Sequence, residues 1–171
     1  MTVHEPVFPI LAFWSGKRMR GESGNERFRE FKDVEALRLA RWDELRPGEW
    51  LGMALVDDAG GAWTIREVHS VGYRTPFWLR GLMWIMNQGG DIEHAVECRL
   101  EQAAPIPFAE VQQRVCASID RNPYDWVDDE AVAGEAGPPL VLADALEPMK
   151  SAVMRATKVS ELFDGLDAAW S

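Results

Sequence analysis

The sequence contains few of the residues that usually carry covalent or redox chemistry. Its 171 residues include only two cysteines, Cys98 and Cys116, and three histidines. Both cysteines lie in segments with apolar periodicity, where a free thiol behaves as a small buried hydrophobe. A disulfide framework of the kind that secreted domains use is therefore not predicted, and we expect a reducing, cytoplasmic setting.

Segments that enter or cross membranes are also lacking. Met1–Pro9 contains His4 and Glu5 instead of a basic start followed by an apolar run, so no signal peptide is predicted. The longest strongly apolar stretch, Phe77–Met86, is interrupted by Arg80 and is too short to cross a bilayer. We expect no membrane partner.

Nucleotide and metal motifs are absent as well. Trp14–Lys17 contains a Gly-Lys pair but lacks the first glycine and the metal-binding hydroxyl of a P-loop. No zinc or calcium ligand spacing occurs. His94 and Cys98 share one face of a predicted strand, and His69 would be the only candidate for a third ligand. That face is apolar, so we interpret both as core residues instead of metal ligands or a nucleophile pair. We expect no metal and no cofactor.

The composition is that of one globular domain spanning residues 1–171, with 47% apolar and 27% charged residues. The net charge of −10 is placed unevenly. Residues 1–100 hold 13 basic and 15 acidic side chains, whereas residues 101–171 hold 5 and 13. This field disfavours nucleic acid and favours a basic protein partner.

Hydrophobic periodicity predicts an α+β fold in the order β-α-β-β-α-β, followed by C-terminal helices. We expect a mostly antiparallel sheet of about four strands with helices packed on one face. The predicted strands are 7–14, 49–56, 62–71 and 92–101. The predicted helices are 33–46, one from residue 77, 108–120, one from about 142 and one from about 159.

Three local expectations can be tested directly. Asp33 should cap a continuous helix to about residue 46. The helix that follows Thr75-Pro76 is apolar nearly all round, which is typical of a helix buried against a sheet. The strict alternation of Ile92–Glu101 should bury His94 and Cys98, and expose their neighbours Glu93, Glu97 and Arg99.

The segment Lys17–Lys32 is basic and contains two phenylalanines, Phe28 and Phe31. Basic side chains interleaved with aromatic ones can bind a phosphate or a single-stranded nucleic acid. Three glutamates in the segment weaken this hypothesis. We favour a solvated, internally ion-paired β-loop.

A possible pocket involves Asp57, Asp58 and His69, which lie on the two arms of the predicted hairpin. Carboxylates beside a histidine can transfer protons, as in a hydrolase. Aspartates at the mouth of a hairpin more often accept hydrogen bonds from turn amides. We favour the turn role and keep a tryptophan-lined pocket near these residues as the alternative.

A mobile acidic loop is predicted over Val127–Pro139, because small residues and prolines there oppose regular structure. Aromatic side chains anchor interfaces and acidic ones steer basic partners. The alternative is that Trp126 folds back onto the sheet and the acids are only solvated. The candidate partner-binding residues are Tyr124, Trp126, Asp128, Asp129 and Glu130.

The general build resembles that of many bacterial immunity and antitoxin proteins, in architecture only and without a shared motif. We therefore expect a non-enzymatic protein–protein interaction module that inhibits a basic partner by occlusion. A small-molecule-binding protein or modest hydrolase remains the alternative.

Overall fold

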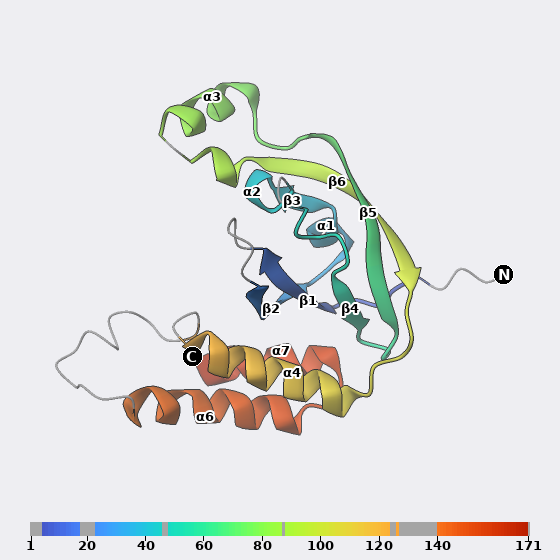
Figure 1. Cartoon of the computed structure of the whole chain (residues 1–171), viewed down its shortest axis with the longest axis vertical. Coiled ribbons are helices and arrows are strands. Elements are labelled where there is room, and N and C mark those ends of the chain that lie inside the picture. Colours follow the sequence, from blue (N-terminus) through green and yellow to red (C-terminus); the bar gives the residue numbers. More distant parts are fainter. Residues whose placement is uncertain are drawn as a thin grey trace.

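The computed structural model describes residues 5–17, 23–45, 48–86, 88–123, 126 and 140–170. It confirms the α+β class (Figure 1). The strands are β1 (Ile10–Lys17), β2 (Ser23–Phe31), β3 (Leu39–Arg41), β4 (Ala54–Asp57), β5 (Ala62–Tyr73) and β6 (Glu93–Gln102). The helices are α1 (Val34–Leu37), α2 (Trp42–Leu45), α3 (Phe77–Ile85), the 3-10 turn η1 (Gly89–Asp91), α4 (Phe108–Arg121), α6 (Leu140–Arg155) and α7 (Val159–Trp170).

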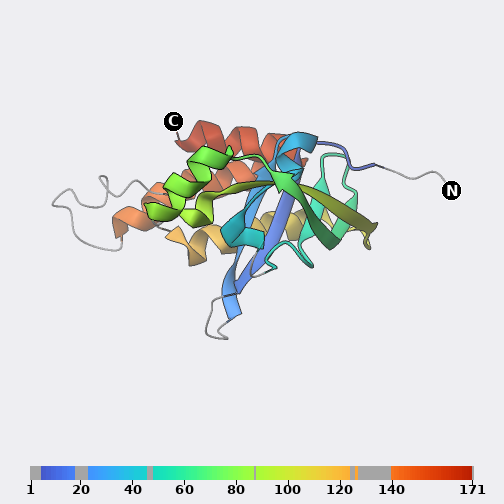
Figure 2. The ribbon, with the colours of Figure 1, turned by 90° about the horizontal axis from the view of Figure 1, so that it is seen from above.

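The strands form one antiparallel sheet in the order β2-β1-β4-β5-β6-β3. It has six strands, so the expected count of about four was too low. One extra strand is β2, which lies in the segment Lys17–Lys32 that the sequence predicts as a solvated β-loop outside the four expected strands. Its register runs from Ile10 opposite Phe31 to Lys17 opposite Ser23. Four of its nine residues are charged, which is common in an edge strand. Figure 2 shows the β1–β2 hairpin extending outward from the body of the molecule.

The second extra strand interrupts the helix expected over residues 33–46. Asp33 does cap a helix, since its carboxylate accepts from the Ala36 amide at 2.8 Å. That helix, α1, ends at Leu37, and β3 follows it and pairs with the start of β6. Pairing with an existing strand outweighs the helical pattern of the sequence, because local propensity is a weak preference.

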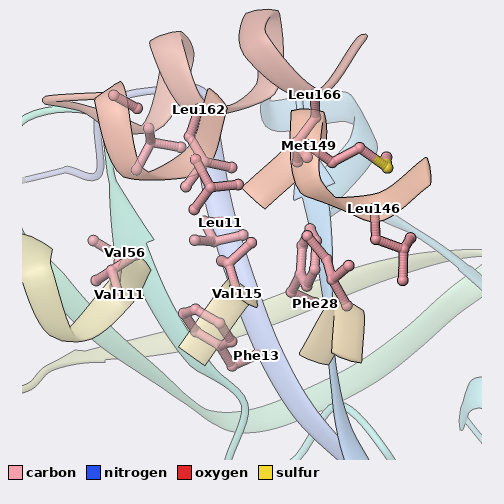
Figure 3. Close-up of a cluster of buried hydrophobic side chains, with 14 residues drawn as sticks. Leu11, Phe13, Phe28, Val56, Val111, Val115, Leu146, Met149, Leu162 and Leu166 are labelled. Carbon is pink, nitrogen blue, oxygen red and sulfur yellow. The ribbon is translucent and has the colours of Figure 1, made fainter. Parts of the chain in front are cut away.

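Helices α4, α6 and α7 form a layer on one face of β1, β2 and β4, as expected for the C-terminal half (Figure 1). The amide of Gln112 on α4 donates to the carbonyls of Val153, Met154 and Ala156 at 2.9–3.0 Å, which ties α4 to the end of α6. Figure 3 shows the apolar cluster between layer and sheet. Its buried members include Leu11, Phe13, Phe28, Val56, Val111, Val115, Leu146, Met149, Leu162 and Leu166.

A second apolar cluster fills the opposite side of the curled sheet. Residues from the 36–53 segment close it, and Trp50 at its centre is almost fully buried. The remaining buried members are Ile10, Ala12, Phe31, Leu37, Ala40, Met53, Leu55, Trp63, Ile65 and Val96. The sheet is thus covered on two sides where β1 and β4 lie.

The predicted facing of β6 is confirmed in its main features. His94 is buried and Cys98 is half-buried, whereas Glu93, Glu97 and Arg99 are exposed. Burial raises the pKa of the Cys98 thiol to about 11, and its Sγ donates to the carbonyl of Leu37. A thiol with so high a pKa is a poor nucleophile, so Cys98 acts as a packing residue.

Candidate interaction surface

Strands β5 and β6 form an arm whose tip carries α3 and η1. The two strands pair from Trp63 opposite Gln102 to Tyr73 opposite His94. Their connection is not a tight turn but the segment that contains α3. Figure 1 places α3 at the end of the molecule opposite to the α4–α6–α7 layer.

The expectation that α3 is buried against the sheet is wrong, because none of its residues is buried. The most exposed side chains are Ile85 at 84%, Phe77 at 83% and Trp78 at 72%. A pattern that is apolar nearly all round indicates that something covers the helix, but it does not say that the cover belongs to the same chain. The apolar residues of α3 therefore did indicate an interaction surface in the sequence, once a cover from another chain is allowed.

The outward side chains of α3 and its C-cap define what we call the α3 patch. Its members are Phe77, Trp78, Leu82, Trp84, Ile85 and Met86. None of them is charged. Monomeric proteins rarely expose so many contiguous large apolar side chains, and such patches mark interaction sites. Aromatic residues and methionine are also the types enriched in protein interfaces.

A stack of four side chains fixes α3 to the arm. The guanidinium of Arg80 lies 3.9 Å from the ring centre of Tyr73, whose ring lies 4.4 Å from that of His94. His94 in turn stacks on Trp42, with ring centres 5.3 Å apart. Arg80, the only charged residue of α3, therefore lies against Tyr73 of the arm, and its guanidinium is also 5.4 Å from the ring centre of Phe77.

Two further contacts position the base and the end of α3. The hydroxyl of Thr75 accepts from the Glu93 amide at 2.8 Å, which joins the two strands of the arm just before the helix begins. At the other end Gly89 lies against the ring of Trp84, where an added Cβ would come within 2.7 Å of the ring. Only glycine fits there, so the sequence Gly89-Gly90 allows η1 to pack under α3.

The surroundings of His94 favour its neutral form. It is 3% exposed, and burial together with the nearby Arg80 lowers its pKa. Its Nδ1 is 2.9 Å from the Ser70 hydroxyl, whereas its buried Nε2 has no hydrogen-bond partner in the described part of the chain. A serine nucleophile needs a histidine oriented by a third group. The Ser70 hydroxyl is therefore better explained as a hydrogen-bond partner that holds the His94 ring within the stack.

Asp57 holds the hairpin turn between β4 and β5. Its carboxylate accepts from the amides of Val7, Ala59 and Gly61 and from the indole of Trp63. It is buried at 3% exposure. All these donors keep the carboxylate in place as an acceptor, which is the turn role that the sequence favoured.

Asp58 connects the same turn to α7. It accepts from the Ser160 amide at 2.7 Å and lies 3.6 Å from the Lys158 ammonium. Burial alone would raise its pKa, but the bonds from Ser160 and the charge of Lys158 outweigh burial and lower it. Asp58 is thus an ionised acceptor at the start of a helix.

His69 lies away from both aspartates. It is exposed on β5 opposite Glu97, with the Glu67 carboxylate 3.4 Å from its Nε2. Along β5 it lies seven residue steps from Ala62, the strand's first residue beside the turn, which corresponds to roughly 23 Å. The structure does not bring Asp57, Asp58 and His69 together.

Of the proposed partner-binding residues, Trp126 alone lies within the described residues. Its ring stacks on Phe28 with centres 4.9 Å apart, and it is half-buried against the helical layer. This is the packing that the alternative interpretation anticipated. Tyr124, Asp128, Asp129 and Glu130, together with the predicted loop 127–139, lie outside the described residues.

Within those described residues, no group of three or more metal-ligating side chains occurs, and no helix is long and apolar enough to cross a membrane. No family model, no curated protein and no solved structure matches the chain. Its function must therefore be inferred from its own surface.

Proposed function

We propose that the chain is a non-enzymatic interaction module that binds a protein partner through the α3 patch. The observation that carries this proposal is a helix with three side chains more than 70% exposed, Phe77, Trp78 and Ile85, held at the tip of a two-stranded arm. Leaving such side chains in water costs free energy in proportion to their apolar area. A partner that covers them would recover it.

The spacing of the patch suits a groove on the partner. Trp78, Leu82 and Ile85 stand at helix positions i, i+4 and i+7, which place three anchors along one side. Amphipathic helices that dock into apolar grooves use this spacing. Tryptophan is the residue type most often found to dominate binding energy, so Trp78 is the proposed principal anchor.

Charge would select the partner before contact. The chain has a net charge of −10, which would attract a basic partner at long range. The α3 patch has no charged member and would make the apolar contacts at short range. Asp128, Asp129 and Glu130 are the proposed steering charges for a basic partner. Occlusion of that partner, as an immunity-type or antitoxin-type inhibitor would do, is the proposed mode of action.

Site-specific photo-cross-linking tests the proposal. A photoreactive phenylalanine analogue replaces Trp78 in one variant and Met154 in the control variant. Met154 is 55% exposed on α6, so both probes are accessible but lie at opposite ends of the molecule. We expect the probe at position 78, and not that at 154, to capture a discrete protein in native cells.

Binding of the captured protein, once purified, must then depend on the patch. Trp78→Ser should weaken affinity at least tenfold, as expected of an interface anchor, and Met154→Ser should leave it unchanged. Raising the salt concentration should slow association. Equal capture by both probes, or equal affinity of both serine variants, would contradict the proposal.

A further inference from the structure

The edge of β6 is only partly covered by β3. The pairs run from Leu39 opposite Ala95 to Arg41 opposite Glu93 and go no further. Before Leu39 the chain turns into α1, because Asp33 caps a helical turn there. The Val96 amide still donates to the Arg38 carbonyl at 2.8 Å, and among the described residues this is the last backbone bond on that side.

Beyond Val96 the backbone of β6 faces outward without a strand beside it. Alternate residues of an antiparallel strand present their N–H and C=O groups to the same side. Since the Val96 amide points to that side, the N–H and C=O groups of Cys98, Leu100 and Gln102 do so too. In the described ranges no strand pairs with them on that side. Such an edge is a template for another strand.

A groove of about 920 Å³ lies along this edge. Phe8, Leu37 and Leu100 give it an apolar lining. We call it the β6 groove. Its full lining is Glu5, Pro6, Phe8, Val34, Glu35, Leu37, Arg38, Val71, Arg74, Ala95, Val96, Glu97, Cys98 and Leu100.

The charges of the β6 groove favour a basic occupant. Its two basic side chains, Arg38 and Arg74, both pair with Glu35 at 3.7 and 3.2 Å. Glu5 and Glu97 form no ion pair with any residue that the structure describes. Glu97 lies on the solvent face of β6, beside the position that the side chains of an added strand would take.

We infer that the β6 groove binds an extended segment of a partner protein, which adds to β6 as a further strand. Backbone bonds to Cys98 and Leu100 would hold it, as in other cases of strand addition. Its side chains would alternate, apolar ones toward Phe8 and Leu37 and basic ones toward Glu97. The site is separate from the α3 patch and does not depend on the function proposed for that patch.

Peptide binding tests the inference. The probe is a blocked ten-residue peptide of alternating valine and lysine. Its controls are the valine–glutamate analogue and two N-methylated copies, one methylated at every valine and the other at every lysine, so that each copy blocks the amides on one side of the strand. We expect binding of the lysine peptide, with slower amide exchange at Cys98 and Leu100. N-methylation on the edge-facing side should weaken binding roughly tenfold or more, because backbone bonds are lost.

Two matched charge reversals distinguish an effect of charge within the β6 groove from an effect of the net charge of the whole protein. Glu97→Arg should weaken binding of the lysine peptide and permit binding of the glutamate peptide. Glu110→Arg, an exposed site on α4, makes the same change of charge elsewhere and should have little effect. Trp78→Ser should leave peptide binding unchanged, so that failure of the α3 proposal and failure of this one can be told apart.

The inference is overturned if the lysine peptide does not bind, if N-methylation on either side is equally harmless, or if both charge reversals act alike. It is also overturned if the free protein sediments as a dimer that Glu97→Arg dissociates, since the edge would then hold a second copy.

Discussion

The two ends of the molecule both carry helices with large apolar side chains, but the surroundings of those side chains are opposite. At one end α4, α6 and α7 bury Val115, Leu162 and their neighbours against β1, β2 and β4. At the other end α3 presents Phe77 and Ile85 to solvent. Large apolar side chains on a helix indicate that another surface covers them. One end of the molecule finds that surface within the chain, whereas α3 finds none among the described residues. The predictions below test this contrast, beginning with the largest effect.

Truncation of the helical core should be the most costly change. Leu162 is fully buried on α7, and Leu162→Ala should lower the free energy of unfolding by about 3 kcal/mol or more, through lost burial and a residual cavity. Urea denaturation measures this. A loss below about 1 kcal/mol would mean that the layer is far more loosely packed than its burial indicates.

Changes in the turn between β4 and β5 should cause the second-largest loss of stability. Asp57→Asn removes a charged acceptor that serves four donors, and should cost about 2 kcal/mol. Asp58→Asn, which weakens one amide hydrogen bond and removes one ion pair, should cost less. Thermal unfolding of both variants makes the comparison. A larger loss at position 58 would reverse the roles that we assign to the two aspartates.

Acid should loosen the α3 end. The folded pKa of His94 is lowered, so the unfolded chain, with a histidine pKa of about 6.5, binds more protons in mildly acid solution. The stability that neutral His94 contributes is therefore complete above about pH 6.5 and is lost as the pH falls toward the folded pKa. Denaturation followed from pH 7.5 to 5 should show this decline.

The variant His94→Phe keeps an aromatic ring between Tyr73 and Trp42 but cannot take up a proton. Its decline over the same pH range should be smaller than that of the wild type. An identical pH dependence in both proteins would show that other groups cause it.

The smallest effect is expected on the α3 patch itself. Ile85→Ser should change the free energy of unfolding by no more than about 0.5 kcal/mol, because the side chain is 84% exposed in the free protein. The same denaturation experiment that follows Leu162→Ala measures it. A loss comparable to that of the core variant would show that α3 is covered in the free protein, and the contrast between the two ends would disappear.

Elements that obey a local rule were predicted well. The alternation in β6, the hairpin with Gly60 at a φ of +82° and the helix α4 all follow from neighbouring residues. The burial of individual tryptophans could not be predicted from neighbouring residues. Trp50 is almost fully buried and Trp78 is exposed, although the pattern around Trp78 is the more apolar of the two. Side-chain chemistry is the same in both places, and only the position of the surrounding chain differs.

Local patterns in the sequence were enough to predict the α+β class, the hairpin between β4 and β5 and the C-terminal helices, because periodicity, caps and turns act between residues close in the chain. Tertiary structure decided that β3 replaces part of a helix, that β2 is a strand and that α3 has no cover within the described chain. Each of these depends on which surfaces meet across long separations in sequence, where a packed neighbour outweighs local propensity. The α3 patch and the open edge of β6 belong to that second group.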